Sequence, residues 1–259
     1  MPYKTALGHT YDSGDFKKNL SDCLLLADYN SFESRKNISL KNNKYRGIGI
    51  STYIEACGGG GPEYSSIKIG GNGNIEVKIG TQSNGQGHAT SYAQIVSEVL
   101  GVPINEINVI QGNSLEIVKG SGTGGSRSMP VGGNALHLAA KKLLDHTKKA
   151  LANYLNTSSD KILYKEGFFQ FNNKQFSLSN LTQLFNSNEI LKVDENWAPK
   201  ENTFTYPNGT HICELEIDKF TGVVKILNYT VVDDFGKVIN PILLEGQVHG
   251  GIAQGIGQA

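Results

Sequence analysis

The chain has 259 residues, enough to bury one large hydrophobic core or two smaller ones. Its 24 basic and 24 acidic residues balance, which argues against nucleic acid as a partner and leaves no basic surface for a membrane. No apolar run approaches the ~18 residues of a spanning helix, and the N-terminus lacks a signal-peptide core, so we expect a cytoplasmic protein without membrane insertion.

Residues 1–46 are polar and carry helical spacing of apolar side chains. Asp12 to Asp15 can cap a helix that contains Phe16 and Leu20, and a shorter segment follows at 29–41. We predict that this region is a mostly helical N-terminal connecting arm.

Residues 47–202 form the first predicted unit. Residues 48–54 are apolar enough for a buried strand, and residues 67–79 alternate around a glycine turn, as a β-hairpin does. A helix after residue 88, a strand at 107–111 and a long helix at about 134–155 follow. We expect the stretch 160–200, with a small hairpin and a helix capped near Ser177, to be a peripheral insertion.

Residues 203–259 form the second predicted unit. Another hairpin pattern spans 213–232, and a loop leads to Gly246 and Gln247, where we expect a helix to begin. The order of hairpin, loop, Gly-Gln-x-His and helix therefore occurs twice, which makes an internal duplication plausible. The last helix has no stop signal before Ala259, so we expect the chain to be part of a longer protein.

Glycine is enriched and bunched: 31 residues are glycine, well above the usual ~7%. The bunches lie at 58–61, 70–73, 80–87, 120–133 and 246–257. Bunched glycine between patterned elements predicts unusual backbone conformations or close approach to a ligand.

The first chemical motif is Gly-Gln-Gly-His, which contains Gln86, Gly87 and His88. Free N–H groups at a helix start beside a side-chain amide suit a polar, anionic ligand, and Gln247 repeats the signal. The alternative is a tight turn with a polar cap.

The second motif is the cluster Gly125, Ser126, Arg127 and Ser128. Backbone amides, two hydroxyls and a guanidinium predict a phosphate site, and the alternative is a flexible surface loop. The cluster lacks the lysine of a Walker A loop. The histidines show no zinc-binding spacing and the three cysteines are scattered, so we predict no metal ligands and no iron–sulfur cluster in this chain.

Three segments together resemble the molybdopterin-binding large subunit of the xanthine oxidase, aldehyde oxidase and aerobic carbon monoxide dehydrogenase family. They are Gly-Thr-Gln-Ser-Asn-Gly-Gln-Gly-His at 80–88, Gly-Thr-Gly-Gly-Ser-Arg-Ser-Met-Pro-Val-Gly-Gly at 122–133, and the stretch 232–259 with Glu-Gly-Gln-Val-His-Gly. The opening Tyr-Asp-Ser-Gly-Asp at 11–15 also looks like the family's segment between two cofactor-binding halves. The residues of these motifs resemble the carbon monoxide dehydrogenase branch of the family more than the animal xanthine oxidases.

The resemblance implies an α+β fold of mixed β-sheets with helices packed on one side, in two related cofactor-binding units. It implies a molybdenum hydroxylase that inserts water-derived oxygen into a C–H bond of an aldehyde or N-heterocycle, or oxidises carbon monoxide. The cofactor would be molybdopterin, in bacteria usually the cytosine dinucleotide, with molybdenum. Electrons would pass to iron–sulfur and FAD groups on separate partner subunits, in a dimer of heterotrimers.

Carried over by motif, Gln86 and Gly87 would contact the pterin and its phosphate region, with His88 a weaker correspondence. Gly125, Ser126 and Ser128 would line the cofactor, with Arg127 near the dinucleotide phosphates, and Gln247 would bind the pterin from the other side. The family's Phe-Gly motif would lie upstream and its glutamate base downstream, so we predict no catalytic residue in this chain.

Two other classes remain open. A non-catalytic cofactor-binding fragment or paralogue would keep the fold and the motifs without chemistry. A nucleotide-dependent transferase would use the same glycine loops for nucleotide phosphates, although the missing P-loop lysine argues against it.

Overall fold

The computed structural model describes residues 1–59, 61–185, 191–200 and 204–259. Its backbone contacts divide the chain into two compact units. Unit 1 comprises Met1–Cys57 and Phe204–Lys237, and unit 2 comprises Gly58–Thr203 and Val238–Ala259. Gly60 of the first glycine bunch, and residues 186–190 and 201–203 of the first predicted unit, lie outside the described residues.

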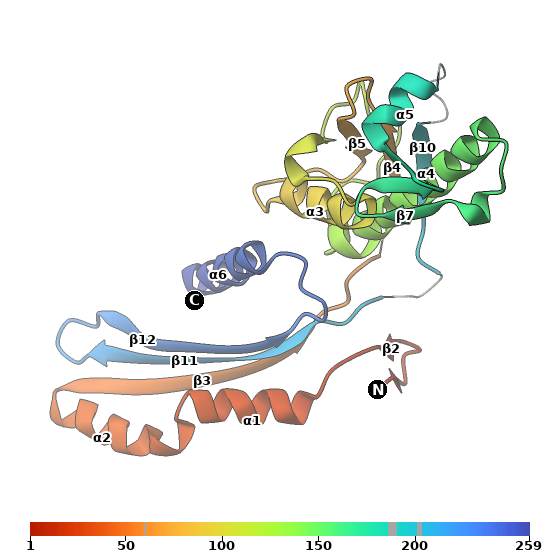
Figure 1. Ribbon diagram of the computed structural model, residues 1–259. Coiled ribbons are helices and arrows are strands. Elements are labelled where there is room, and N and C mark those ends of the chain that lie inside the picture. The colour runs from red at the N-terminus through yellow and green to blue at the C-terminus, as the bar shows by residue number, and fades with distance from the viewer. Residues whose placement is uncertain (60, 186–190, 201–203) are drawn as a thin grey trace. The chain divides into compact units, whose positions relative to one another are not determined.

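Unit 1 is a three-stranded antiparallel sheet with two helices on one face (Figure 1). The strand order is β12 (Val224–Asp234), β11 (Asn208–Asp218) and β3 (Lys44–Ile54). Helix α1 (Phe16–Leu26) packs on β11 and β12, and α2 (Phe32–Lys41) packs on β3. Two short strands, β1 (Tyr3–Lys4) and β2 (Thr10–Tyr11), pair with each other before α1.

The local chemistry explains how unit 1 forms. Asp15 caps α1 by accepting a hydrogen bond from the Lys18 amide at 3.1 Å, as the sequence predicts. Cys23 on the inner face of α1 is fully buried, and its thiol donates to the Thr210 carbonyl at 3.3 Å. Cys23 therefore has the structural role of a small buried residue.

The expectation of a buried strand at 48–54 is wrong. These residues belong to β3, an edge strand of unit 1, and all of them are exposed or half-buried. The strand pairs along its whole length with β11, from Lys44 opposite Asp218 to Ile54 opposite Asn208. Apolar content alone does not distinguish an edge strand from a central one, because both carry β-branched residues.

Unit 2 contains a four-stranded mixed sheet. The order is β10 (Lys192–Trp197), β4 (Glu63–Ile69), β5 (Ile75–Ile79) and β6 (Ile107–Ile110), with β5 and β6 parallel and the other pairs antiparallel. Helices α3 (His88–Leu100) and α4 (Asn134–Tyr154) pack on the sheet. The predicted mixed sheets with packed helices are thereby confirmed.

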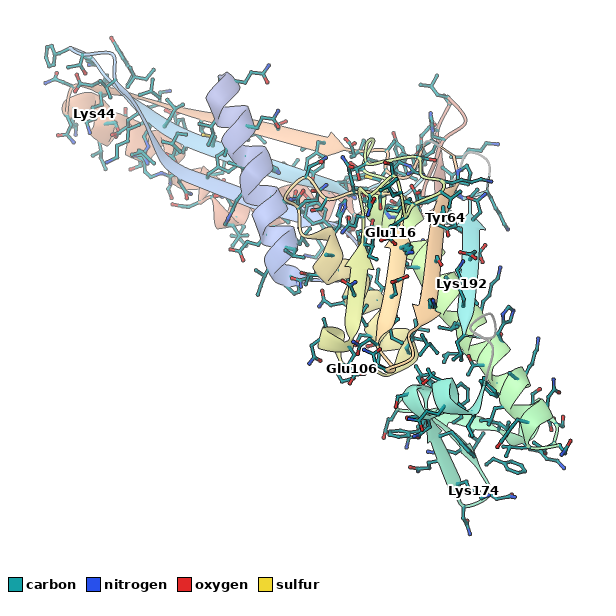
Figure 2. The ribbon with its side chains drawn as sticks, turned by 90° about the horizontal axis from the view of Figure 1, so that it is seen from above. Lys44, Tyr64, Glu106, Glu116, Lys174 and Lys192 are labelled. Carbon is teal, nitrogen blue, oxygen red and sulfur yellow. The ribbon has the colours of Figure 1, made fainter. Side chains whose placement is uncertain are left out.

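The core of unit 2 follows the alternation of β5. Ile75, Val77 and Ile79 are fully buried and pack with the apolar sides of α3 and α4, where Tyr92 and Leu143 are also fully buried. On the other face of the sheet the side chains are polar. There Lys78 pairs with Glu116 at 2.7 Å, and Tyr64 donates to Asp194 at 2.7 Å; Figure 2 labels Tyr64 and Glu116.

The stretch 160–200, expected as a peripheral insertion, contributes to the core of unit 2. It forms a small antiparallel sheet of β7 (Leu163–Lys165), β8 (Phe168–Phe171) and β9 (Lys174–Ser177), followed by α5 (Leu178–Leu184). Ser177 caps α5 in a capping box with Asn180. Phe169 and Leu181 are fully buried in the core, and β10 is an edge strand of the main sheet.

The boundaries of the compact units also differ from the predicted ones. Residues 1–46 are not a separate arm, because α1 and α2 cover the sheet of unit 1. The chain leaves unit 2 to form β11 and β12 and returns to it at Val238. The long-range pairing of β3 with β11 sets these boundaries. Local sequence patterns do not predict that pairing.

The expectation that a helix begins at Gly246 and Gln247 is wrong. Helix α6 (Pro241–Gln258) begins one turn earlier, where the Asn240 side chain accepts a hydrogen bond from the Leu243 amide at 3.0 Å. Asn followed by Pro is a good helix start, because Asn caps and Pro fits the first turn. Gly246 and Gln247 are therefore inside the helix, and their amides are not free N-terminal donors.

Candidate functional site

The predicted ligand residues other than Gln247 lie on, or directly after, two loops of unit 2 that run side by side. One loop, residues 80–87, links β5 to α3, and the other, residues 120–127, follows β6 and leads through a π-helical turn (Ser128–Gly133) to α4. The Gln82 amide donates to Thr123 Oγ1 at 3.1 Å, and that hydroxyl donates to the Gln82 carbonyl at 2.6 Å. The structure thus brings the two glycine motifs together.

Glycine is required where these loops begin. A Cβ on Gly80 would lie 2.4 Å from the Gly120 Cα, and a Cβ on Gly120 would lie 2.7 Å from the Gly80 Cα. Any side chain at either position would push the loops apart. A third loop, named loop 58–62 after its described residues 58, 59, 61 and 62, contacts the second loop through a hydrogen bond from the Gly58 amide to the Gly125 carbonyl at 3.4 Å.

Other glycines in the loops face open space and hold unusual backbone conformations. Gly85, Gly122 and Gly125 have positive φ angles of 108°, 74° and 54°, and no atom lies within 4 Å of a Cβ built on any of them. Ser126 also has a positive φ, 51°, although it is not glycine. Consecutive amides in such left-handed conformations form concave sites for anions.

Gln86 lies beside this open region, half-buried. Its side-chain carbonyl accepts hydrogen bonds from the Asn84 amide and from the Ser83 hydroxyl at 3.4 Å, which fixes the loop. Gly87, with φ of 76°, is the residue before α3.

His88 is the first residue of α3 and is buried, with 6% of its surface exposed. Its Nδ1 atom is buried without a hydrogen-bond partner. Burial lowers the pKa of the imidazole below its ordinary value of 6.5, although the Gln82 backbone acts in the opposite direction. A neutral ring with an unused nitrogen beside the loops is able to bond a ligand.

A buried hydroxyl network links the two loops beneath His88. Tyr92 Oη lies 2.5 Å from Thr81 Oγ1 and donates to the Ser128 carbonyl at 3.1 Å. Burial raises the pKa of the Tyr92 phenol to about 12, so the phenol stays protonated at neutral pH. Ser128 is itself buried, and its hydroxyl lies 3.4 Å from Thr123 Oγ1.

Arg127 is placed differently from the other predicted ligand residues. It is 3% exposed, and its guanidinium forms an ion pair with Glu63, which is fully buried. The same guanidinium donates to the carbonyls of Gly59, Gly61 and Gly122 at 2.9–3.1 Å. The other two arginines of the chain, Arg35 and Arg46, both bond Glu214 in unit 1.

Gln247 is exposed on α6, in the same unit as the two loops. Helix α6 meets the first motif through Leu243, since a Cβ on Gly87 would lie 2.5 Å from Leu243 Cδ2. Asn240 also donates to the Gln94 side chain of α3 at 2.8 Å. Gln247 follows Leu243 by four residues and so shares its side of the helix.

Sequence reasoning missed Glu63 and Leu243. Glu63 begins a strand, and an isolated glutamate there is usually exposed. Leu243 is one of several apolar residues in α6. The sequence offered part of a signal for Glu63. A buried arginine needs a carboxylate partner, and this chain has few arginines to consider.

Within the described part of the chain, no group of three or more His, Cys, Asp or Glu side chains could hold a metal ion. No helix there is long and apolar enough to cross a membrane. The loops therefore offer amides, hydroxyls, a side-chain amide and one neutral imidazole. These donors suit a polar ligand that carries phosphate.

The fold and the loops define a mixed α+β protein with a glycine-lined pair of loops whose donors suit an anionic ligand. A family model for the molybdopterin cofactor-binding domain matches residues 22–259, and the chain belongs to this family. Carbon monoxide dehydrogenase large chain of Hydrogenophaga pseudoflava is 31% identical over 98% of this chain. Nicotine 6-hydroxylase large subunit of Paenarthrobacter nicotinovorans is 30% identical over 99%.

Solved structures agree with the sequence relatives. Carbon monoxide dehydrogenase from Oligotropha carboxidovorans superposes with a TM-score of 0.83 over 96% of this chain and 34% of that chain, at 31% identity. Quinoline 2-oxidoreductase from Pseudomonas putida 86 gives a TM-score of 0.87 over 100% and 36%, at 26% identity. The chain spans about a third of the length of these relatives, 34% of both the carbon monoxide dehydrogenase and the nicotine hydroxylase chains.

Proposed function

We propose that this chain is the cofactor-binding part of the large subunit of a molybdenum hydroxylase. The observation that carries the proposal is the junction of loops 80–88 and 120–128, with glycines that face open space at left-handed backbone conformations. The family of the chain supplies the chemical identity of the ligand, molybdopterin.

The described residues fit such a ligand. The positions at Gly85, Gly122 and Gly125 leave room that a Cβ would fill, and His88 Nδ1 is a buried nitrogen that still needs a partner. Phosphate would bind to the backbone amides and to the hydroxyl of Ser126. Gln86, Gly87 and Ser128 would line the pterin side, and Gln247 would approach it from α6.

When bound, the cofactor supplies a molybdenum centre that transfers oxygen to the substrate and accepts two electrons. The residues of this chain bind and orient it. The close pairing of Gly80 with Gly120 fixes the distance between the two loops, and the Tyr92 hydroxyl fixes the start of the π-helical turn. We assign no catalytic residue to this chain.

The finer points of the proposal are those that the family resemblance implies. The substrate would be an aldehyde, an N-heterocycle or carbon monoxide, and the cofactor would be the cytosine dinucleotide form. The electrons would leave through iron–sulfur and FAD subunits, in a dimer of heterotrimers. Support for a multi-subunit enzyme comes from relatives named as a large chain, a large subunit and a complex subunit.

A charge placed in the phosphate site tests the proposal. Ser126 has a positive φ, which Asn and Asp both tolerate, so Ser126→Asp and Ser126→Asn differ chiefly in charge. In the full-length protein, purified with its partner subunits, molybdenum, pterin and acid-released CMP are measured per chain. We expect the wild type and Ser126→Asn to carry all three in equal amounts and Ser126→Asp to lose most of them.

Two results would overturn parts of the proposal. An active wild-type enzyme without pterin would remove the cofactor assignment. Equal cofactor content in Ser126→Asp and Ser126→Asn would show that the phosphate does not bind at this loop. If the protein contains pterin but releases no CMP, only the assignment of the cytosine dinucleotide form is wrong.

A further inference from the structure

We propose that Glu63 and Arg127 are a positioning pair, which shapes the cofactor loops from beneath while the phosphates bind to neutral groups. The inference deepens the proposed function and rests on it. It concerns a residue, Glu63, that no sequence motif indicated, and it changes the role of Arg127 from a phosphate ligand to a support.

The burial of the pair is the first observation. The side chain of Glu63 is fully buried and that of Arg127 is 4% exposed. A guanidinium in this position cannot reach a ligand without leaving its carboxylate. Separating the two would leave an unpaired charge in the interior, which is strongly unfavourable.

The hydrogen bonds of Arg127 are the second observation. Its Nε donates to the Gly59 carbonyl at 3.1 Å, one terminal nitrogen to the Gly122 carbonyl at 2.9 Å, and the other to the Gly61 carbonyl at 3.1 Å. The guanidinium thus binds loop 58–62 and loop 120–127 at once. The planar fork of arginine makes this possible, and lysine could not satisfy the same set.

Glu63 completes the arrangement from the strand side. Its Oε1 atom accepts from the Ser121 amide at 3.3 Å and from the Tyr64 amide at 3.1 Å. A Cβ on Gly80 would lie 2.0 Å from the same oxygen, so Glu63 also touches the loop that carries Gln86. One buried carboxylate therefore contacts, directly or through Arg127, all three loops.

This arrangement has a chemical consequence. Arg127 is committed to Glu63 and to the carbonyls of Gly59, Gly61 and Gly122, so it offers no free charge to a ligand at Gly124–Ser126. Gly124 and Gly125 have nothing within 4 Å of a Cβ position. The pair thus fixes the anion site without contributing a charge to it.

The variant Glu63→Gln separates the two roles for Arg127. If Arg127 only positions the loops, loss of the carboxylate charge loosens them and the cofactor leaves faster. If Arg127 binds phosphate directly, Glu63→Gln frees the guanidinium, and the cofactor stays or binds more tightly. Arg127→Lys keeps the positive charge and loses the fork, so positioning predicts faster loss there too.

The experiment uses the full-length protein with its partner subunits. Cofactor release is followed as pterin fluorescence after dilution, and hydrogen exchange of loops 58–62 and 120–128 is measured by mass spectrometry. We expect release about tenfold faster in Glu63→Gln and Arg127→Lys, with faster exchange in these loops and unchanged exchange in β4 and β5. Arg35→Lys, the same replacement at a partly buried ion pair of unit 1, is the matched control and leaves release and loop exchange unchanged.

Several outcomes would overturn the inference. Unchanged or slower release in Glu63→Gln assigns Arg127 to the ligand. Faster exchange throughout β4 and β5 would mean that Glu63 and Arg127 stabilise unit 2 as a whole and do not specifically position the loops. If the wild type holds no pterin, the proposed function fails, and the exchange data still decide whether the pair orders the loops.

Discussion

Leu243 Cδ2 lies 2.5 Å from the place that a Cβ on Gly87 would occupy. The C-terminal helix α6 therefore packs directly on the bend of the first glycine motif. The Asn240–Gln94 hydrogen bond, at 2.8 Å, supports the same contact from the start of the helix. This contact keeps Gln247 in the same part of unit 2 as Gln86, although Gln247 is inside a helix and not at its start.

The contact between Leu243 and Gly87 predicts that a methyl group at position 87 lowers the free energy of unfolding. Gly87→Ala and Gly85→Ala both place alanine at a positive φ, which costs about 1 kcal/mol. Only the change at Gly87 also meets Leu243, so we expect it to destabilise unit 2 by about 1–3 kcal/mol more. Urea unfolding measures the difference, and Leu243→Ala in the Gly87→Ala background should recover part of it. Equal costs for the two alanine variants would contradict the contact.

A second prediction concerns the hydroxyl that links the loops. Tyr92→Phe keeps the buried ring and removes the bonds to Thr81 and to the Ser128 carbonyl. We expect a loss of about 1–2 kcal/mol in the free energy of unfolding, because both partners remain buried. Hydrogen exchange of the π-helical turn should also become faster. A variant as stable as the wild type would show that these bonds are replaced by others.

A third prediction concerns pH. The pKa of His88 is lowered by burial, so between this lowered value and 6.5 the unfolded chain binds a proton that the folded chain does not. The stability contributed by neutral His88 is present above pH ~6.5 and is lost as the pH falls through the lowered pKa. His88→Phe keeps a ring beside Tyr92 and does not titrate, so the melting temperature of the wild type should fall more steeply below pH ~6.5. Parallel curves for the two proteins would exclude a lowered pKa.

A fourth prediction concerns the buried carboxylate of unit 1. Burial raises the pKa of Glu214, but hydrogen bonds from Arg35 and Arg46 outweigh it and leave the pKa below 4.5. Glu214→Gln leaves two guanidinium groups without their carboxylate, and we expect a loss of about 2–3 kcal/mol at pH 7. Because a lowered pKa stabilises the folded state only above the ordinary value, the difference from the wild type should shrink as the pH falls below ~4.5.

The matched control for Glu214 is Glu33, whose pair with Lys36 is exposed at both ends. Glu33→Gln should change the free energy of unfolding by less than ~0.5 kcal/mol. Hydrogen exchange of β11 localises the loss in Glu214→Gln to unit 1. A similar effect for both variants would mean that burial of Glu214 is not the cause.

Local elements were largely predictable from the sequence, because their signals are local. The helix cap at Asp15, the capping box at Ser177 and the hairpin of β4 and β5 each depend on residues within a few positions of one another. The partners of β3 were not predictable, since β11 is distant in the chain and its apolar pattern fits many neighbours. The same limit explains why 160–200 looked peripheral.

The two glycine motifs were found from the sequence because glycine has few reasons to cluster. The contacts that hold the two motifs in place were not predicted. The pairing of Arg127 with Glu63 and that of Gly87 with Leu243 are tertiary contacts, and neither residue pair has a spacing that signals contact. The second Gly-Gln motif misled because Asn240 and Pro241 already form the helix start.

The path of the chain between the units has a consequence for its biosynthesis. Unit 1 needs strands from both before and after Gly58–Thr203, and unit 2 needs α6, which follows the strands of unit 1. A nascent chain that has just released β10 from the ribosome therefore carries two unfinished bodies, one without its central strand and one without the helix that packs on Gly87. Domains usually fold in the order of their synthesis. Here unit 1 must wait for β11 and β12, and unit 2 must wait for α6. The interval between the release of β10 and the release of α6 is therefore the period in which chaperones have most to protect.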